Sequence, residues 1–490
     1  MRYEPSINLT TLVYTNKNMT LPLSTSATIH ISRCPALDPF APEVLFGHFA
    51  SQTHSIFLDS SRHTEQARYS ILLWQPVLSV ISQQQVTNVV VHAAQWQSFV
   101  AAYHNRSLNP LAQVQRLHEA IFGQKEGLSN LDLPFKVGFA GHFGYDLGIY
   151  IEAFEDYQVG EYQTPDMSCH LYLHSLIYDH QTQQYTLCTY GEDRQHRALQ
   201  ATLLDLVQTA LPSTAFTLTD TWQANMSESE YTQSIAKIHD YILAGDCYQT
   251  NFAQRFDNAY EGDEYQYYLA LRAKNLAPFS CFVRTEQGAI LSLSPERFIQ
   301  ARHGRVETKP IKGTMPRSAD PVKDQDFANA LLSSEKDRAE NLMIVDLLRN
   351  DLSKHCQAGS IEVPKLFALE TYPAVHHLVS TVTGTLAHPQ DIYALLAGAF
   401  PGGSITGAPK IRAMQIIQEL EPNGRNIYCG SIGYIGMDYD MDTNICIRTV
   451  LCENNRVYCW AGGGIVLDSE ARAEYAETKH KISKIIPLTD

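Results

Sequence analysis

The chain has 490 residues, of which 44% are hydrophobic and 18% are charged, so it can bury one or two sizeable cores and is not a disordered polymer. Its formal net charge of −15 argues against nonspecific binding to nucleic acid or anionic membranes, because phosphate-rich partners require clustered Lys and Arg. The sequence shows no apolar signal-like run near its start and no stretch approaching the roughly 18 apolar residues of a membrane span. We therefore expect a cytoplasmic protein without nucleic-acid or membrane partners.

Residues 1–225 are predicted to be rich in short strands, and no long Pro/Gly linker separates them from residues 226–490. The clearest β-rich runs are 86–91 and 185–190. The segment 138–147 combines glycines with aromatic residues, which is typical of close backbone packing in a sheet. The two parts are therefore expected to be interleaved rather than divided by a clean boundary.

Residues 226–490 contain the clearest helix signals. Ser227 and Glu230 form a capping box, the isoleucines that follow share one face, and Gly245 is suited to the end of the helix. A strand is expected directly afterwards, at 247–252. A second helix is predicted over 334–353, and its core-facing side is predicted to be Leu342, Val345, Leu348 and Leu352.

The last predicted helix starts near Asp468 or Ser469 and ends before Pro487. It places Glu474, Glu477 and Lys481 at i, i+3 and i+7, so the three share one face. Spacing alone fits an ordinary solvated face, because Glu477 and Lys481 form an i, i+4 pair. The consecutive glycines at 462–464, just before this helix, instead suit close approach to a ligand.

The run 308–314 contains Lys312 followed by Gly313 and Thr314. Most lysines before a glycine are merely solvated, but a glycine here also lets backbone N–H groups approach an anionic ligand. Further short motifs before and after this run favour the interpretation as a ligand-binding turn. They lie at 293–298, 338–341, 372–380, 401–410, 447–449 and 473–479.

This ordered set resembles the chorismate-utilising enzyme family from about residue 226 to the C-terminus. The resemblance implies an α+β fold in which two large antiparallel sheets pack face to face with helices outside. Within the family, the Pro-Ile-Lys-Gly-Thr spelling at 310–314 is similar to the component I enzymes of the para-aminobenzoate branch. The anthranilate-forming members carry alanine at the position of Lys312. Tyr439 departs from the family, which often has glycine there, and only a local change of turn is expected.

The resemblance implies a Mg²⁺ site formed by Glu340, Glu474 and Glu477. Hard oxygen ligands suit Mg²⁺, which commonly keeps waters and bridges to a substrate carboxylate. It would hold the ring carboxylate of chorismate.

Chorismate has two carboxylates, so a second cationic anchor is needed. The resemblance assigns Arg448, with Tyr428 and the Gly464 backbone, to the enolpyruvyl carboxylate, which a guanidinium fork can bind bidentately. By itself Arg448 could be an ordinary outward-facing strand residue. The remaining candidates for substrate binding are Gly313, Thr314 and His377 near the ring carboxylate, together with Gln249 and Lys481. His377 alone would more often be a core or surface histidine.

The implied reaction is amination of chorismate to 4-amino-4-deoxychorismate, in para-aminobenzoate and folate biosynthesis. The neutral amine of Lys312 would attack C2 while Glu296 protonates the departing 4-hydroxyl, and ammonia would then displace the lysine. Without the resemblance, Glu296 would be interpreted as a partner of Arg297. Gln249 stands where water-adding relatives carry a lysine base, and an amide cannot take up a proton at neutral pH. The alternatives are anthranilate synthase component I and a non-catalytic regulatory homologue.

Ammonia is expected from a separate partner, a glutamine amidotransferase component II. None of the ten cysteines lies in a Gly-x-Cys-x-Gly elbow, and none forms a C-x-x-C pair, so reduced thiols are expected. The resemblance also implies an amino-acid pocket in the N-terminal part, whereas the residues by themselves favour core packing. Its residues would be Leu58, Ser60, Arg68, Tyr69, Pro278 and Phe279.

Overall fold

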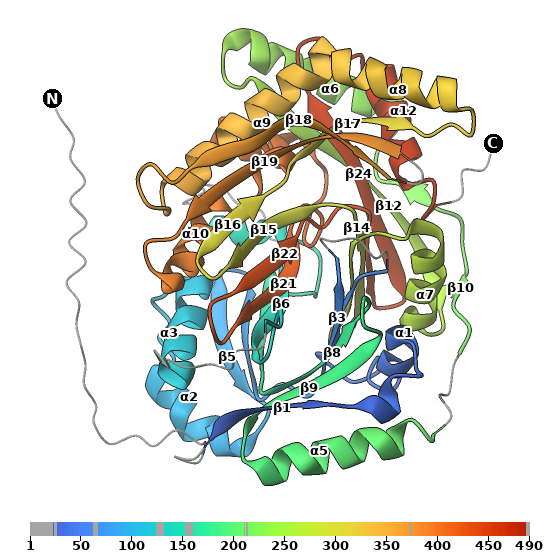
Figure 1. Ribbon diagram of the computed structural model, residues 1–490. Coiled ribbons are helices and arrows are strands. Elements are labelled where there is room, and N and C mark those ends of the chain that lie inside the picture. The colour runs from blue at the N-terminus through green and yellow to red at the C-terminus, as the bar shows by residue number, and fades with distance from the viewer. Residues whose placement is uncertain are drawn as a thin grey trace, which may run out of the picture.

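The computed structural model describes residues 23, 27–61, 67–123, 132–151, 160–209, 211, 214–372 and 375–486. Two large antiparallel sheets form the centre, and helices lie around them (Figure 1). The predicted α+β fold is therefore confirmed. The first residues of the chain, Pro373, Ala374 and Pro487 lie outside the described part.

The larger sheet has 13 strands within the described residues. Its order is β1 (Thr28–Arg33), β9 (Gln184–Gly191), β8 (His174–Asp179), β3 (Tyr69–Leu73), β2 (Ile56–Asp59), β13 (Phe279–Arg284), β14 (Gly288–Ser294), β23 (Thr449–Glu453), β24 (Arg456–Ile465), β12 (Gln249–Glu261) and β10 (Thr217–Leu218). Two short strands, β11 (Gln223–Ala224) and β20 (Gly407–Ala408), also pair with β12.

The second sheet has 11 strands within the described residues. Its order is β17 (Ile311–Pro316), β19 (Val375–Thr385), β16 (Arg305–Thr308), β15 (Arg297–Arg302), β22 (Met441–Asn444), β21 (Ser431–Gly436), β6 (Gly138–Phe143), β7 (Met167–Tyr172), β4 (Leu78–Gln83) and β5 (Val86–Val91). The strand β18 (Glu362–Thr371) pairs with β19 on its other side. Both halves of the sequence contribute to both sheets, because β2 pairs with β13 and β6 pairs with β21.

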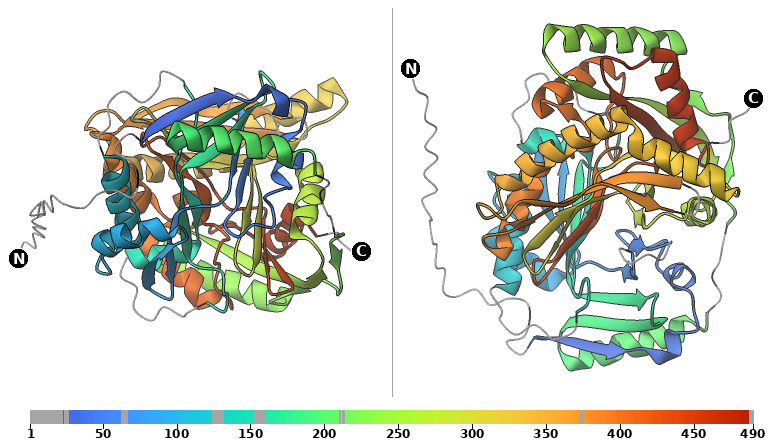
Figure 2. Two further views of the ribbon diagram at one scale, coloured as in Figure 1. Left: turned by 90° about the horizontal axis from the view of Figure 1, so that it is seen from below. Right: turned by 45° about the horizontal axis from the view of Figure 1, so that its top comes forward.

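Helices cover the outer faces and ends of the sheets, as the views of Figures 1 and 2 show. They are α1 (Pro42–Phe46), α2 (Gln97–Tyr103), α3 (Pro110–Phe122), α4 (Gly148–Ile151), α5 (Asp193–Leu206), α6 (Glu228–Ala244), α7 (Glu264–Asn275), α8 (Pro321–Ser333), α9 (Glu335–Ser353), α10 (Ile392–Ala399), α11 (Lys410–Leu420) and α12 (Ala471–Ile482). None of the described helices is long and apolar enough to cross a membrane.

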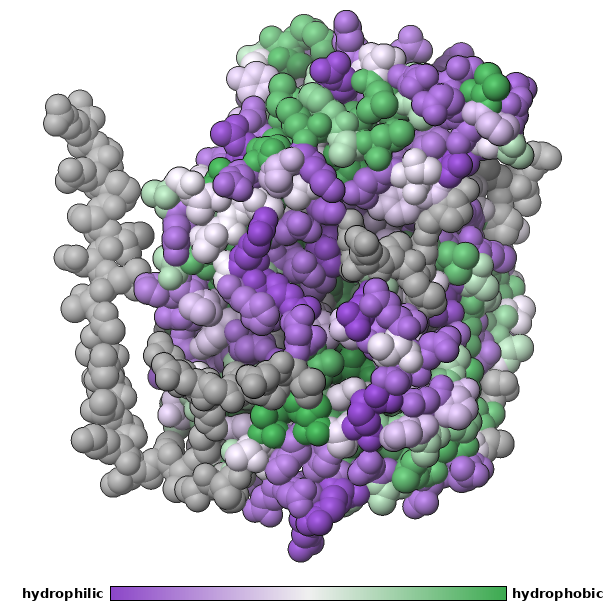
Figure 3. Space-filling view, in the orientation of Figure 1, coloured by the Kyte–Doolittle hydropathy of each residue, from purple (hydrophilic) through white to green (hydrophobic). Residues whose placement is uncertain are grey.

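The main hydrophobic core lies between the two sheets. Val80 and Phe139 of the smaller sheet belong to the same buried cluster as Ile290 and Leu451 of the larger one. A second cluster lies on the outer face of the larger sheet, where Tyr268 of α7 packs with strand residues such as Phe57. Hydrophilic residues cover much of the face shown in Figure 3, with the largest hydrophobic area at the top of the view.

Most predicted elements of residues 226–490 are confirmed. Ser227 and Glu230 form the reciprocal capping box of α6, and Gly245 ends that helix in the left-handed conformation with φ of 83°. The predicted helix over 334–353 is α9, with Ser334 as its N-cap. The last helix begins later than predicted, at Ala471, and ends at Ile482.

One predicted core residue of α9 is wrong. Leu342 is 45% exposed, whereas Val345, Leu348 and Leu352 are buried. Asn341 takes the buried position instead, because 341, 345, 348 and 352 are spaced to share one helical face and position 342 is rotated about 100° away from it.

The predicted turn at Tyr439 is also present. The residue follows β21, its N–H donates to the Gly436 carbonyl at 2.9 Å, and its φ is 64°. A left-handed φ favours glycine, which explains why a glycine suits this position. The Tyr439 ring stacks on His118 with centroids 4.3 Å apart.

Candidate active site

Strand β17 positions Lys312 through a bulge at the next residue. The pairing of β17 with β19 shifts register between Lys312 and Thr314, and Gly313 between them has φ of 75°. A Cβ at Gly313 would lie 2.8 Å from Leu331 and 2.9 Å from the Asp337 carboxyl carbon. Only glycine therefore fits here, where β17 packs against α8 and α9.

The Lys312 amine lies among charged groups from three other elements. Its side chain is half-buried, and burial lowers its pKa, helped by the positive charge of Lys481. Glu340 and Glu296 act in the opposite direction. A lysine with a lowered pKa has a larger neutral fraction at neutral pH, which is the form that can act as a nucleophile.

Glu296 follows β14 and is 7% exposed. Burial raises the pKa of its carboxyl to about 7, although the Lys312 charge, the Ile311 N–H and Ser404 oppose that shift. The Ser404 hydroxyl donates to Glu296 Oε1 at 3.5 Å. The alternative pairing with Arg297 is wrong, because the Arg297 guanidinium bonds both oxygens of Asp442 instead, at 2.8 and 2.9 Å. Glu296 is thus suited to hold a proton near neutral pH.

Carboxylates from α9 and α12 lie near this pair. Burial raises the pKa of Glu340, and the charge of Glu474 raises it further, whereas Lys312 opposes both effects. Glu474 is 8% exposed and accepts a hydrogen bond from Ser469 at 2.8 Å. We call Lys312, Glu296, Glu340, Glu474 and Glu477 the lysine–carboxylate cluster.

The Glu477 side chain pairs with Lys481 at 2.7 Å, as the i, i+4 spacing predicts. Burial alone would raise the Glu477 pKa, but the Lys481 charge brings it below its ordinary value. Among the described residues, Glu340, Glu474 and Glu477 do not form a group whose oxygens all lie within 4.8 Å of one another. All three side chains nevertheless offer carboxylate oxygens, which are hard donors of the kind that divalent cations such as Mg²⁺ prefer.

The glycine run at the end of β24 brings α12 close to the strand. A Cβ at Gly463 would lie 3.1 Å from Glu474 Oε2 and 3.4 Å from Lys481 Nζ. Lys481 also donates to the Gly462 carbonyl at 3.0 Å. The glycines thus admit the charged side chains of α12.

Arg448 lies between β22 and β23, in a left-handed conformation with φ of 51°. The interpretation as an outward-facing strand residue is therefore wrong. Its side chain is half-buried, burial lowers its pKa, and its carbonyl accepts from the Leu293 N–H at 3.1 Å. Within the described part of the chain it has no carboxylate partner within 4.0 Å. A partly desolvated guanidinium without an internal anion suits an anionic ligand.

Gln249 and Gly464 lie side by side on β12 and β24. A Cβ at Gly464 would lie 2.6 Å from Gln249 Nε2. Gln249 is fully buried, and neither polar atom of its amide has a hydrogen-bond partner in the described structure. Such an amide is costly unless a ligand or water satisfies it. Tyr428 is also buried, and its ring stacks on Trp460 with centroids 6.1 Å apart.

Thr314 and His377, which the sequence grouped with Gly313, lie in contact. Thr314 Oγ1 is 2.9 Å from His377 Nδ1 across the β17–β19 pair, and His377 is 8% exposed. The Tyr372 ring packs edge-on against His377 at 5.4 Å. These contacts fix the imidazole beside the bulge that presents Lys312.

Two residues of the site were not assigned a role from the sequence. Ser404, which contacts Glu296, lies within 401–410, one of the motifs that carry the family resemblance. That motif could have indicated Ser404 from the sequence. Arg425 is 1% exposed and pairs with Glu421 at 2.6 Å. It also donates to the carbonyls of Ile405 and Asn251, at 3.1 and 3.0 Å. Arg425 thereby ties the Ser404 loop to β12, which no sequence pattern indicated.

The six residues predicted to form an amino-acid pocket line one cavity of about 490 Å³. Leu58 and Tyr69 also pack against the main hydrophobic core, so both interpretations of this set stay open. Its charged residues are paired within the protein, since Arg68 contacts Asp179 at 2.6 Å and Arg297 contacts Asp442.

The sequence profile of the family described as chorismate binding enzyme matches residues 53–487. The chain therefore belongs to this family.

Two of its relatives carry the same name within this family. It is 45% identical over 453 residues to aminodeoxychorismate synthase component 1 of Klebsiella aerogenes, covering 91% of this chain and 96% of the relative. It is 50% identical over 359 residues to the protein of that name from Escherichia coli (strain K12), covering 73% and 78%. Among solved structures, anthranilate synthase component I from Streptococcus pneumoniae superposes with a TM-score of 0.71 at 28% identity, covering 86% of this chain and 92% of that one.

Proposed function

We propose that this enzyme aminates chorismate to 4-amino-4-deoxychorismate, for para-aminobenzoate synthesis. The relatives with 45% and 50% identity carry the name of that activity. The observation that carries the proposal is that Lys312, whose pKa burial lowers, lies near enough to interact electrostatically with Glu296, whose pKa burial raises to about 7. An acid and a nucleophile side by side are what substitution of a hydroxyl group needs.

In the first step, the lone pair of the Lys312 amine forms a bond to C2 of the ring. The double bonds shift through the conjugated ring diene, and the C4–O bond breaks. Glu296 donates its proton to the departing oxygen, which leaves as water, and the proton that the lysine nitrogen loses restores the protonated Glu296. In the second step, ammonia attacks C4 and gives up one proton, the double bonds shift back, and the C2–N bond to Lys312 breaks as the lysine nitrogen takes up one proton. Chorismate and ammonia thus give 4-amino-4-deoxychorismate and water.

Positively charged side chains would hold the two substrate carboxylates, with Arg448 at one and Lys481 near the other. Arg448 would bind the enolpyruvyl carboxylate, since its guanidinium has no internal carboxylate partner among the described residues. Tyr428 and the Gly464 backbone would line that subsite, with Gln249 beside it. Gly313, Thr314 and His377 would surround the ring carboxylate, and Lys481 would add positive charge.

We further propose that Glu340, Glu474 and Glu477 hold a Mg²⁺ ion. A bound Mg²⁺ would neutralise and orient the ring carboxylate of the substrate. The donor set fits this ion, because all three side chains offer carboxylate oxygens and the charge of Glu474 acts on Glu340. Two of the three come from α12, which the glycines of β24 allow to approach closely.

Ammonia would come from a glutamine amidotransferase component II, since the relatives are named component 1. The isolated chain should use ammonium salts but not glutamine, and should gain glutamine use with that partner. We place the enzyme in the cytoplasm, which agrees with its ten free cysteines.

The experiment is product identification with purified chain, chorismate, Mg²⁺ and an ammonium salt. We expect 4-amino-4-deoxychorismate, with a rate that rises with pH as free ammonia increases. Anthranilate as the product would support the anthranilate alternative, and no turnover with intact chorismate binding would support the regulatory one. Glutamine-dependent turnover by the single chain would contradict the need for a partner.

A further inference from the structure

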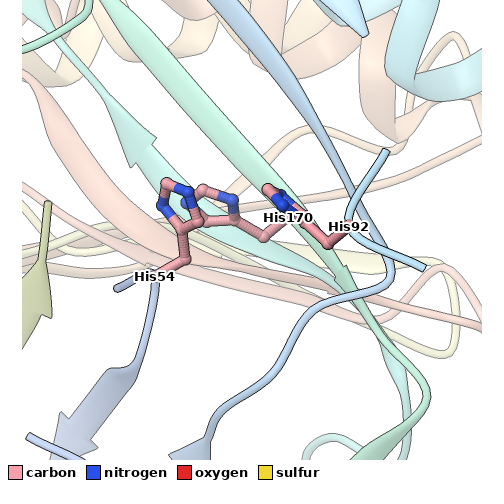
Figure 4. A group of neighbouring side chains, drawn as sticks. All are labelled: His54, His92 and His170. Atoms are coloured by element: carbon pink, nitrogen blue, oxygen red, sulfur yellow. The ribbon is translucent and has the colours of Figure 1, made fainter. Parts of the chain in front are cut away.

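A group of histidines lies where the two sheets meet, on strands that contribute nothing to the lysine–carboxylate cluster. His170 lies on β7, and His92 directly follows β5 of the same sheet. His54 belongs to the other sheet, because it precedes β2 and its N–H donates to the Arg284 carbonyl of β13 at 3.0 Å. The three side chains point toward one another (Figure 4). They therefore connect the two sheets.

The spacing of their ring nitrogens is close to that of a metal site. One nitrogen from each of His54, His92 and His170 lies within 4.8 Å of those of the other two. Within the described part of the chain, no other three His, Cys, Asp or Glu side chains are grouped in this way. The ligating nitrogens of imidazoles on a tetrahedral ion lie about 3.4 Å apart, which is inside this limit. His92 is exposed at the end of its strand.

Metals bind imidazole in its neutral form, and the burial of His54 and His170 favours that form. Burial lowers the pKa of His54 to about 4, and the proximity of His92 and His142 lowers it further. Burial also lowers the pKa values of His170 and His92.

Neighbouring serines hold the rings in place. Ser79 Oγ lies 2.7 Å from His92 Nε2 and 2.6 Å from His170 Nδ1, so it bridges the two rings. Ser168 Oγ lies 3.1 Å from His170 Nε2. Metal-bound histidines commonly donate their second N–H to such an acceptor. Ser168 can serve in this way, which leaves Nδ1 of His170 for an ion that replaces the Ser79 bridge.

The surroundings offer room and a negative charge. A cavity of about 100 Å³ is lined by His54, His142 and His170 together with Glu286, but not by His92. This volume is well above the roughly 10–15 Å³ that one water needs. The Glu286 carboxylate lies 3.9 Å from His54 Nε2. Arg284 also lines this cavity, but its guanidinium donates to the Ala50 carbonyl and to Glu264, at 2.7 and 2.8 Å. Its charge is thus compensated elsewhere.

We propose that His54, His92 and His170 bind one divalent first-row transition ion, with Glu286 or water as the fourth ligand. Three imidazoles suit Zn²⁺, Ni²⁺ or Cu²⁺ rather than Mg²⁺, which prefers oxygen. Since the ligands come from both sheets, the ion would fasten one sheet to the other. The site is therefore structural and does not depend on the proposed reaction.

The test is a Zn²⁺ titration of chelator-treated full-length chain by calorimetry and thermal unfolding, in excess Mg²⁺ so that carboxylate sites are occupied. We expect one equivalent of Zn²⁺ to bind and the Tm to rise with Zn²⁺ concentration, because an ion that binds only the folded state stabilises it. His92→Gln, at an exposed position, should weaken Zn²⁺ binding at least about ten-fold and abolish the Tm rise.

His54→Gln is judged by Zn²⁺ affinity alone, because its side chain is buried and the change also affects folding. Ser168→Ala keeps all three ligands and should lower the affinity by about ten-fold. His388→Gln is the matched control, since His388 is an exposed histidine outside the group, and it should bind like the wild type. Absence of Zn²⁺ binding, or equal affinity in wild type and His92→Gln, overturns the proposal.

Discussion

The lysine–carboxylate cluster and the cavity around Arg68 both collect charged side chains beside the two sheets, but they satisfy those charges differently. In the cavity, Arg68 meets Asp179 and Arg297 meets Asp442, each with two hydrogen bonds. In the cluster, Lys312 has no carboxylate within 4.0 Å among the described residues, although Glu340 and Glu296 are near enough to affect its pKa.

The difference separates structural charges from reactive ones. A guanidinium bonded to both oxygens of a carboxylate is already neutralised and has little left to offer a ligand. A lysine and a glutamate whose pKa values are displaced toward neutrality, without being bonded to each other, remain able to exchange protons and bind anions. The state of pairing, and not burial alone, therefore points to the cluster as the place of chemistry.

The largest expected effect tests whether Lys312 is a nucleophile. When ammonia is withheld, chorismate should add mass to the peptide that contains Lys312, as measured by peptide mass spectrometry. Lys312→Ala should abolish that label and lower formation of the 4-amino product by at least about 10³-fold.

Lys309→Ala is the matched control, because Lys309 lies on the same stretch of chain but faces Glu370 at 3.6 Å. It should keep both label and rate. A small yield of 2-amino product from Lys312→Ala is compatible with direct attack by ammonia at C2. Wild-type formation of the 4-amino product by Lys312→Ala, with no adduct in the wild type, would rule out the covalent route.

The next effect concerns the carboxylates of α9 and α12. Glu340→Gln and Glu477→Gln should each lower turnover by roughly 100-fold or more and raise the Mg²⁺ concentration needed for half-maximal rate, because a hard-cation site loses a charged ligand. Steady-state rates over a Mg²⁺ series measure both changes. Glu335→Gln, at the exposed start of α9, should behave as wild type. If either site variant is fully active in buffer treated with EDTA, the metal assignment is wrong.

Much of the fold was predictable because local signals agreed with it. The capping box at Ser227 and the glycine at 245 define both ends of α6 from neighbouring residues alone. The burial of Asn341 in place of Leu342 was not predictable, because an apolar residue one position away fitted the hydrophobic pattern better. Asn341 is buried by a contact distant in sequence, since it accepts a hydrogen bond from Ser380 at 2.5 Å.

In the candidate site, too, local motifs were predictable and contacts between distant residues were not. The short motifs around Lys312 and Glu477 indicated which residues to consider, and the resemblance supplied their roles. The pairing of Arg297 with Asp442 joins residues far apart in the chain, so a local rule matched Glu296 to the wrong partner. The role of Arg425 likewise depends on tertiary contacts that carry no local pattern. Ser404 lies in one of the short motifs, but its contact with Glu296 is tertiary.

Arg448 of the candidate active site and Arg297 of the cavity around Arg68 provide a third test. Arg448→Gln should raise KM for chorismate by about 100-fold, because a bidentate anchor for a carboxylate is lost. Arg297→Gln should instead lower Tm with little change in KM, since its partner Asp442 is part of the protein. Steady-state kinetics and thermal unfolding on both variants make the comparison. An unchanged KM in Arg448→Gln would remove it from the substrate site.

The smallest effect is a pH dependence of stability caused by Glu296. Its carboxyl pKa rises from an ordinary value of 4.5 to about 7 on folding, so between these pH values the folded state holds a proton that the unfolded state has released. Stability from this group is therefore fully present below about pH 4.5, is lost as the pH rises to about 7, and changes no further above it. The loss should be on the order of 3 kcal/mol, because each pKa unit corresponds to about 1.4 kcal/mol. Glu296→Gln has no such proton, so its unfolding free energy should fall less than that of the wild type between pH 5 and 8, whereas Glu335→Gln should follow the wild type. Parallel curves for wild type and Glu296→Gln in urea unfolding would mean that Glu296 is ionised at neutral pH and is unsuited to protonate the leaving oxygen.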